Sequence, residues 1–213
     1  MSIYNRDSNV LFITNPTVAG AAIENRKEIG GNKGHHNIYY FKQRLTDDEF
    51  QNAFKFAFVR NPFDRMIAAF LRGEIRCKSF TLKETQKALV DWFREVPKNS
   101  HRSFADKDLR DKLNVKNHVG GVGIMSFVPQ WYYLCDEDGS IPLDFIGYFE
   151  NKDVDWGKVC KVLNIEYKKL PLVNINKRYD QLLYRDYYVQ ETEDFIREIY
   201  KKDFELFGYS EEL

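Results

Sequence analysis

Apolar residues along the chain gather in short runs that predict buried strands. Residues 10–14 and 56–59 are apolar runs rich in residues that favour β-structure, and residues 144–149 form a third such run. Between and after these runs, apolar positions recur at helical spacing. Strands that alternate with helices usually pair in parallel. The pattern therefore predicts a three-layer α/β fold with a short, mainly parallel sheet flanked by helices.

Two of the expected helices begin with a recognisable capping box. Thr46 with Glu49, and Thr81 with Glu84, have the spacing at which a hydroxyl and a carboxylate satisfy the first backbone groups of a helix. A long helix over about residues 191–207 closes the chain.

The helix after residues 56–59 is the most strongly marked. Asn61 can cap it, and Pro62 suits its first turn. Its apolar stripe consists of Phe63, Met66, Ile67, Phe70 and Leu71. Residues 97–123, in contrast, are polar and poorly periodic, which predicts loops or short helices that could face a substrate.

Composition indicates one globular domain over residues 1–213. The chain has 43% hydrophobic residues and no linker-like segment. Its 32 basic and 32 acidic residues give a formal net charge of zero. That balance excludes a chain-wide cationic surface of the kind that binds nucleic acid non-specifically, so no nucleic-acid partner is expected. A local anion site remains compatible with it.

The cysteines and the apolar runs point to a cytoplasmic protein. Cys77, Cys135 and Cys160 are odd in number and include no C-x-x-C pair, so neither a disulfide framework nor a zinc site is expected. The longest apolar runs, such as residues 66–71, are far shorter than the roughly 20 residues of a membrane span. The N-terminus does not have the pattern of a signal peptide.

The turns after the first two strands are the candidate site, because ligands of parallel sheets bind at the carboxyl ends of strands. Residues 15–22 are mostly small, which lets backbone N–H groups approach an anion, although the Walker A spacing is absent. Arg60 ends the second strand beside a helix start, where a guanidinium can bind a phosphate. Each turn taken alone is equally compatible with a purely structural role.

Taken together, the two turns resemble the motifs of the sulfotransferases that use 3′-phosphoadenosine 5′-phosphosulfate (PAPS). The carbohydrate-modifying branch is the most similar. Pro16 with Ala19-Gly20 is similar to the family's first loop, P-K-T-A-G-T-S, and residues 60–65 are similar to its second motif, R-N-P-[YW]-D-R. Further likenesses are Pro129-Gln130, residues 144–150, Leu170-Pro171 with Asn174 or Asn176, Tyr187-Tyr188, Asp203-Phe204, Phe207-Gly208 and Tyr209.

The resemblance implies a PAPS-dependent sulfotransferase fold and a cofactor site, with adenosine 3′,5′-bisphosphate (PAP) as the product. Arg60 would hold the 3′-phosphate, with Ala68 at the family's serine position, and Lys177 and Arg178 would add charge to the nucleotide. No metal is implied. The residues that would cradle the 5′-phosphosulfate through backbone amides are Pro16, Thr17, Val18, Ala19, Gly20, Ala21 and Ala22.

The same resemblance implies a hydroxyl-bearing acceptor, expected to be a carbohydrate. His35 or His36 falls where related carbohydrate enzymes place a catalytic base, and a neutral imidazole can remove a hydroxyl proton near pH 7. The alternative is an exposed histidine pair with no role. Trp131, Tyr132 and Tyr133 could stack against a sugar ring or could belong to the core.

Departures from the family pattern leave catalysis open. Thr17 stands where the first loop usually has lysine, and alanine replaces its hydroxyl residues at 21 and 22. A cation stabilises charge on the leaving phosphate, so another cation must substitute or catalysis is lost. The candidates to substitute are Arg26, Lys27 and Lys33. The alternative function is therefore a non-catalytic relative that binds a nucleotide or a glycan.

Two further alternatives are a P-loop kinase and a purely structural protein. The absent Walker lysine and the lack of an evident Mg²⁺ carboxylate argue against a P-loop kinase. A purely structural protein would bind no nucleotide at all.

Overall fold

The structure is a computed structural model that describes residues 2–30, 36–73, 81–95, 118–119, 122–171 and 183–213. The chain forms two compact units. Unit 1 comprises Met1–Arg60 and Gln130–Val173, and unit 2 comprises Asn61–Pro129 and Asn174–Leu213. That the whole chain behaves as a single domain stays a prediction.

Unit 1 contains the sheet that the sequence predicts. Its strands are β1 (Ile3–Asn5), β2 (Val10–Ile13), β3 (Phe54–Val59) and β6 (Phe145–Tyr148), in the order β1-β2-β3-β6. β2, β3 and β6 pair in parallel, whereas β1 pairs with β2 antiparallel. The α/β fold with a mostly parallel sheet is therefore confirmed. β1 was not predicted, because its three residues are too short to show a period.

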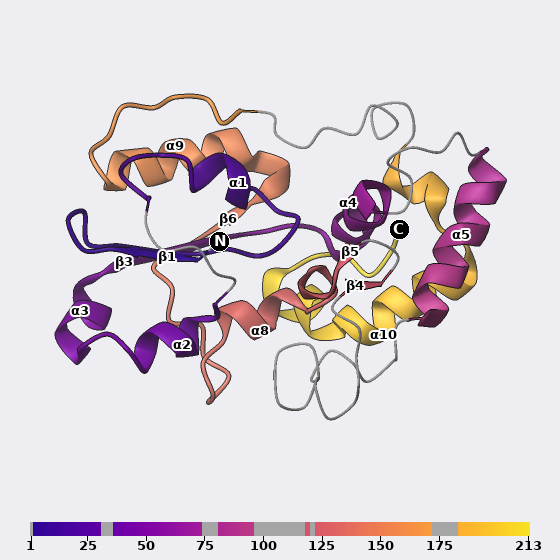
Figure 1. Cartoon of the computed structure of the whole chain (residues 1–213), viewed down its shortest axis with the longest axis horizontal. Helices are drawn as coiled ribbons and strands as arrows, with labels where there is room; N and C mark the ends of the chain where they lie inside the picture. The colour runs from indigo at the N-terminus through magenta and orange to yellow at the C-terminus, as the bar shows by residue number, and fades with distance from the viewer. Residues whose placement is uncertain (1, 31–35, 74–80, 96–117, 120–121, 172–182) are drawn as a thin grey trace. The chain divides into compact units, whose positions relative to one another are not determined.

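Helices cover both faces of this sheet. Figure 1 shows α1 (Gly20–Ile23) and α9 (Lys152–Val162) on one face, and α2 (Ile38–Lys42), α3 (Asp47–Asn52) and α8 (Gln130–Leu134) on the other. On the first face, a core cluster joins Phe12 and Phe56 of the strands with Ile23 of α1 and Trp156 of α9. The Phe12 and Phe56 rings stack with centroids 4.8 Å apart. This packing fixes the chain that leaves β2.

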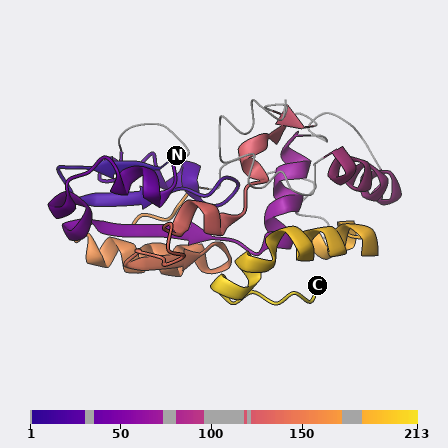
Figure 2. The same ribbon diagram turned by 90° about the horizontal axis from the view of Figure 1, so that it is seen from below.

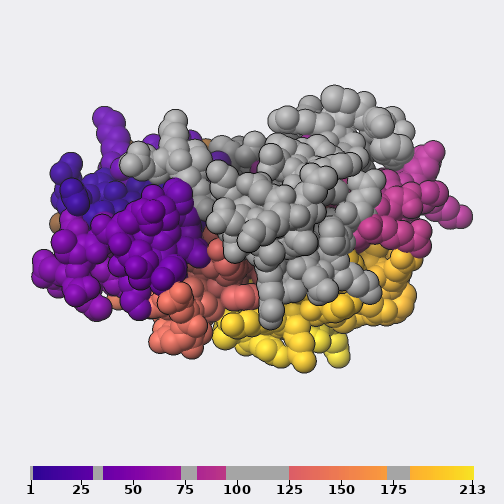
Figure 3. Space-filling view, turned by 60° about the horizontal axis from the view of Figure 1, so that its bottom comes forward, coloured from indigo at the N-terminus to yellow at the C-terminus, as the bar shows by residue number. Residues whose placement is uncertain are grey.

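The second face shows how the sequence signals set local structure. Thr46 and Glu49 form the predicted capping box at the start of α3. In the space-filling view of Figure 3, the surface of α2 and α3 lies beside that of α8 and the turn after it. Lys42 of α2 forms an ion pair with Asp136 in that turn. The pair joins elements that lie far apart in the sequence.

Unit 2 is built around α4 (Pro62–Gly73), α5 (Leu82–Glu95) and α10 (Gln190–Phe207), with a 3₁₀ turn, η3 (Tyr184–Tyr187), before α10 (Figure 2). The predicted cap of α4 is present, because the N–H of Phe63 donates to Asn61 Oδ1 at 2.9 Å. The Thr81–Glu84 capping box precedes α5. All five residues of the predicted α4 stripe are buried: Phe63, Met66, Ile67, Phe70 and Leu71.

At the described end of residues 97–123 the prediction of loops or short helices is wrong. His118–Val119 (β4) and Val122–Gly123 (β5) pair as an antiparallel hairpin, followed by a 3₁₀ turn, η1 (Ile124–Ser126). Two-residue strands carry too little sequence for alternation to be visible.

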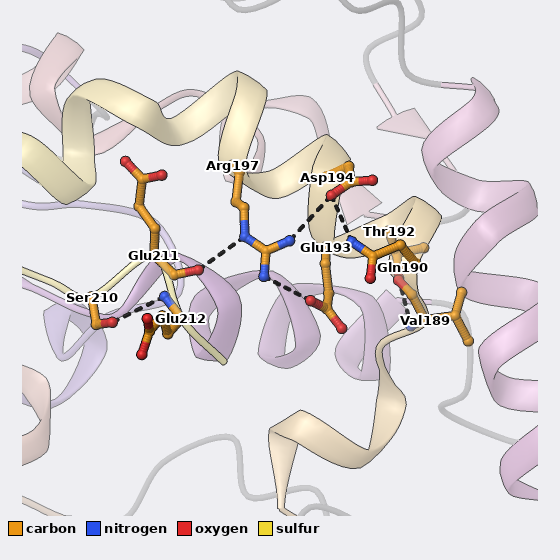
Figure 4. A network of polar contacts seen from close by, with 9 residues as sticks. All are labelled: Val189, Gln190, Thr192, Glu193, Asp194, Arg197, Ser210, Glu211 and Glu212. Carbon is orange, nitrogen blue, oxygen red and sulfur yellow. Dashed lines mark hydrogen bonds and ion pairs between the residues drawn. The ribbon is translucent and has the colours of Figure 1, made fainter.

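The C-terminal tail of unit 2 is held by one arginine of α10. Figure 4 shows the Arg197 guanidinium between Glu193, Asp194 and the tail. It donates to Glu193 Oε2 at 2.7 Å and to the Glu211 carbonyl at 2.9 Å. This network orders the chain end. None of the helices that the structure describes combines the length and apolarity needed to cross a bilayer.

Candidate functional site

The loop after β2, residues 14–19, is held in a conformation that only a few residue types adopt easily. Thr17 has a φ of +63°, in the left-handed region, which is unusual for a β-branched residue. Its hydroxyl donates to the Pro16 carbonyl at 2.6 Å. Since such backbone strain persists only where the surroundings enforce it, the contacts of Thr17 identify what shapes the loop.

Gly20 lets α1 start close to the strand end. A Cβ at this position would lie 2.2 Å from Cγ2 of Thr14, so no larger residue fits without movement. The N–H groups of Ala22 and Ile23 then donate to the Ala19 carbonyl, at 3.0 and 3.3 Å. The N–H groups that precede these at a helix start have no acceptor within the helix. They are the kind of donors that bind phosphates.

The strand end carries two buried polar side chains. Asn15 is 2% exposed, and its Nδ2 donates to the Phe58 carbonyl of β3 at 2.8 Å. Its Oδ1, and the Oγ1 of Thr14, have no hydrogen-bond partner within the described part of the chain. Such buried polar atoms normally have a partner, so the strand end has spare capacity for water or a ligand.

Arg60 joins the end of β3 to this loop. Its Nη1 donates to the Thr17 carbonyl at 3.1 Å. Its guanidinium carbon lies 4.0 Å from the centroid of the Phe149 ring, in the 3₁₀ turn η2 (Phe149–Asn151) that follows β6. The residue as a whole is 6% exposed. One cation therefore contacts the backbone at the loop position where the family usually has lysine.

Gln130, at the start of α8, fixes the backbone of Arg60. Its Oε1 accepts from the Arg60 N–H, and its Nε2 donates to the Arg60 carbonyl, both at 2.9 Å. Gln130 is fully buried. The side-chain amide thus replaces the strand partner that β3 no longer has after Val59, where its pairing with β6 ends.

His36 is tethered to the same strand end through Ser2. The Ser2 hydroxyl accepts from the N–H of Thr14 at 3.0 Å and donates to the His36 carbonyl at 2.6 Å. The imidazole stacks on the Tyr40 ring, with centroids 3.8 Å apart and planes at 10°. Burial and, to a smaller degree, the positive charge of Arg44 lower the pKa of His36. The neutral imidazole is therefore favoured.

The other predicted residues fall in different places. In the loop and α1, Val18 and Ala21 are half-buried, whereas Pro16, Ala19 and Ala22 are buried. Ala68 is half-buried on α4 of unit 2. Three predicted residues lie outside the described residues: His35, Lys177 and Arg178.

The three candidate substitutes for the missing lysine also differ. Arg26 donates from Nη2 to the carbonyls of Lys168 and Lys169, both at 2.9 Å, so its guanidinium holds the loop after α9. Lys27 is exposed, and Lys33 lies outside the described part of the chain. Of the aromatic residues considered for sugar stacking, Tyr133 is buried in the core, and Trp131 and Tyr132 are half-buried.

Three contributors were missed from the sequence: Ser2, Phe149 and the role of Gln130. Ser2 is a single serine outside any motif, and its bond to His36 spans 34 positions. The contact between Gln130 and Arg60 spans 70 positions. The sequence offered one signal for Gln130 and Phe149, because Pro129-Gln130 and residues 144–150 resemble the family pattern. That resemblance carries no information about which atoms meet.

These residues fit an anionic phosphate in part. Main-chain donors, the space kept by Gly20 and the Arg60 guanidinium suit it, whereas residues 16–22 contain no charged side chain. No group of His, Cys, Asp and Glu among the described residues is arranged to hold a metal ion. The chemistry available here is therefore anion binding with a neutral histidine tethered nearby.

Comparison with known proteins agrees with this chemistry. No curated protein and no solved structure matches the chain. The family model described as "Sulfotransferase family" matches residues 15–210, from the first loop to the C-terminal tail. The chain therefore belongs to the sulfotransferase family.

Proposed function

We propose that the protein is a PAPS-dependent sulfotransferase that moves a sulfuryl group to a hydroxyl of a carbohydrate acceptor. One observation carries the proposal: Arg60 Nη1 lies 3.1 Å from the carbonyl of Thr17, so the first loop and the first residue of the second motif meet within unit 1. Family membership over residues 15–210 gives the reaction class. The cofactor and the acceptor are parts of the proposal.

The chain's own residues divide the work of holding PAPS, which supplies the activated sulfuryl group. Backbone N–H groups within residues 17–21 would hold the 5′-phosphosulfate end, since Gly20 keeps the loop close to β2. Arg60 would hold the 3′-phosphate with donors other than the one given to Thr17, because a guanidinium has five. A contribution of Ala68, Lys177 and Arg178 to nucleotide binding stays a prediction from the sequence.

His36 is one of two candidates for the base, together with His35. In its neutral form the imidazole can accept the proton of an acceptor hydroxyl as that oxygen bonds to sulfur. The proton goes to the imidazole, and the bond from sulfur to the leaving phosphate oxygen breaks. The lowered pKa of His36 favours the required neutral form, and Ser2 ties its backbone to the first loop's strand.

A non-catalytic nucleotide or glycan binder is the second candidate function. It is favoured by Thr17, whose hydroxyl donates to the adjacent Pro16 carbonyl and which brings no charge to the loop. Sulfuryl transfer builds negative charge on the leaving phosphate, and a missing donor can cost about a hundredfold or more in rate. The carbohydrate acceptor is supported by the half-buried Trp131 and Tyr132, since aromatic faces suit sugar rings.

Calorimetric titration with PAP, with AMP and ADP as controls, tests the nucleotide site first. Selective binding of PAP supports a 3′-phosphate site, and the absence of binding for all three nucleotides contradicts the proposed function. Turnover of PAPS is then measured with a panel of carbohydrate acceptors. Binding of PAP without turnover on any acceptor, or hydrolysis, favours the non-catalytic function.

A further inference from the structure

We propose that Gln130 and Phe149 are positioning residues that hold Arg60 against the first loop, and that Arg60 thereby sets the orientation of a loop N–H group. The inference rests on the proposed function for its consequence in nucleotide binding. The positioning of Arg60 against the first loop is a property of the protein without any ligand. Gln130, Phe149, Arg60 and Thr17 all belong to unit 1.

Gln130 holds the backbone of Arg60. Beyond the last strand pairing, a buried N–H and C=O need new partners, because each unsatisfied group is costly. Gln130 meets both with one amide, at 2.9 Å each. An amide side chain presents a donor and an acceptor side by side, which matches the N–H and C=O of one residue. A glutamate would keep the acceptor and lose the donor, and a methionine of similar length would lose both.

Phe149 holds the guanidinium of Arg60. Phe149 lies beneath it at 4.0 Å, and the turn that carries Phe149 is itself fixed, because the N–H of Tyr148 donates to the buried Asp155 at 2.8 Å. A cation over an aromatic face is attracted to it, the more so when partly desolvated. Lys152 also lies over this ring, with Nζ 4.9 Å from the centroid. Lys152 therefore provides a matched control for the effect of charge alone.

Arg60 in turn orients the peptide between Thr17 and Val18. In a planar trans peptide the C=O and the following N–H point in opposite directions. The bond from Arg60 Nη1 to the Thr17 carbonyl therefore turns the Val18 N–H away from Arg60. The same bond supports the left-handed φ of Thr17, which is otherwise strained. Arg60 thus acts on the loop at the position that lacks lysine.

The experiment compares backbone NMR shifts of Thr17 and Val18 in the ligand-free full chain. Phe149→Leu and Gln130→Met should both shift these signals, whereas Phe149→Tyr, which keeps the ring face, should retain the wild-type positions. Lys152→Met and the exposed Gln43→Met are the matched controls and should leave them unchanged. Wild-type loop signals in folded Phe149→Leu and Gln130→Met overturn the inference.

AMP affinity gives a second readout that separates the two proposals. Phe149→Leu should weaken AMP binding by about three- to tenfold, the usual effect of one hydrogen bond, because the 5′-phosphate meets a misoriented loop. If Phe149→Leu shifts the loop signals and AMP affinity is unchanged, the orienting role in nucleotide binding is wrong. If the wild-type protein binds neither PAP nor AMP, the proposed function fails while the loop signals still decide the inference.

Discussion

The ends of β2 and β3 differ in what they can offer an anion, although the two strands lie side by side in parallel. β2 leads into residues 16–22, which carry no charged side chain, so their contribution is main-chain geometry. β3 leads to Arg60, whose guanidinium contacts the Thr17 carbonyl of the neighbouring loop. Shape and charge are thus divided between two strand ends, where the family's usual first loop combines them.

This division predicts different consequences for changes at the two ends. Changes at the end of β3 should act mainly on nucleotide affinity, because they remove charge. Changes at the end of β2 should act mainly on stability or turnover, because they alter packing or add a charge that is absent. Variants at Arg60, Gly20 and Thr17 therefore test the comparison.

Arg60→Ala should have the largest effect on binding and weaken PAP affinity by about a hundredfold. Hydrogen bonds between a guanidinium and a phosphate are charge-assisted and stronger than neutral ones. The measurement is calorimetric titration, with Arg6→Ala as the control, since the Arg6 side chain is 72% exposed and pairs with Glu49. The loss for AMP should be smaller than for PAP. Equal losses for both nucleotides would mean that Arg60 does not hold the 3′-phosphate.

Gly20→Ala should destabilise the protein by about 2 kcal/mol, the cost of inserting a methyl group into a packed site. The added Cβ would lie 2.2 Å from Thr14 Cγ2. Chemical denaturation measures the effect. Gly157→Ala is the matched control within α9, where the nearest atom to an added Cβ is Tyr167 Cδ2 at 3.8 Å. It should stabilise the helix by up to about 1 kcal/mol. A similar loss in both variants would contradict the packing argument.

Thr17→Lys should raise PAPS turnover by about tenfold, because it returns a cation to the loop where charge develops on the leaving phosphate. Lysine is not β-branched, so it should tolerate the φ of +63° at least as well as threonine does. Thr17→Gln, long and neutral, is the control and should not increase the rate. An unchanged rate in Thr17→Lys would show that charge at this loop position does not limit transfer.

The elements that could be predicted are those whose signal is local. The strand runs, the capping box of Thr46 with Glu49 and the buried stripe of α4 each depend on neighbours within one or two turns of chain. Gly20 was also predicted as part of the site, because the family's first-loop motif has a glycine at this position. In these cases, the pattern in the sequence and the structure have the same physical cause.

The contacts that organise the candidate site could not be predicted, because they join distant parts of the chain. Gln130 and Arg60 pair across 70 positions, and Ser2 reaches His36 across 34. A single serine or glutamine gives no periodic signal, and its partner is set only when the sheet forms. The sequence identified Arg60 as a candidate phosphate-binding residue. It did not show that the Arg60 guanidinium would contact the first loop.

The pH dependence of stability should show the smallest effect, through His36. Burial, and then the charge of Arg44, lower the pKa of this histidine in the folded protein. The unfolded chain therefore binds more protons as the pH falls below the ordinary histidine pKa of about 6.5, and unfolding takes up a proton. The stability that depends on the neutral ring is fully present above that pH and is lost as the pH falls through the folded-state pKa.

Thermal unfolding of the wild type and of His36→Gln between pH 7.5 and 5.5 measures the stability that depends on the neutral His36 ring. The wild type should lose more stability over this range than His36→Gln, since glutamine does not titrate. Arg44→Gln should reduce the difference without abolishing it, because burial is the larger cause. Parallel pH profiles for the wild type and His36→Gln would show that the ring is not held in its neutral form by folding, which would remove the main argument for His36 as the base.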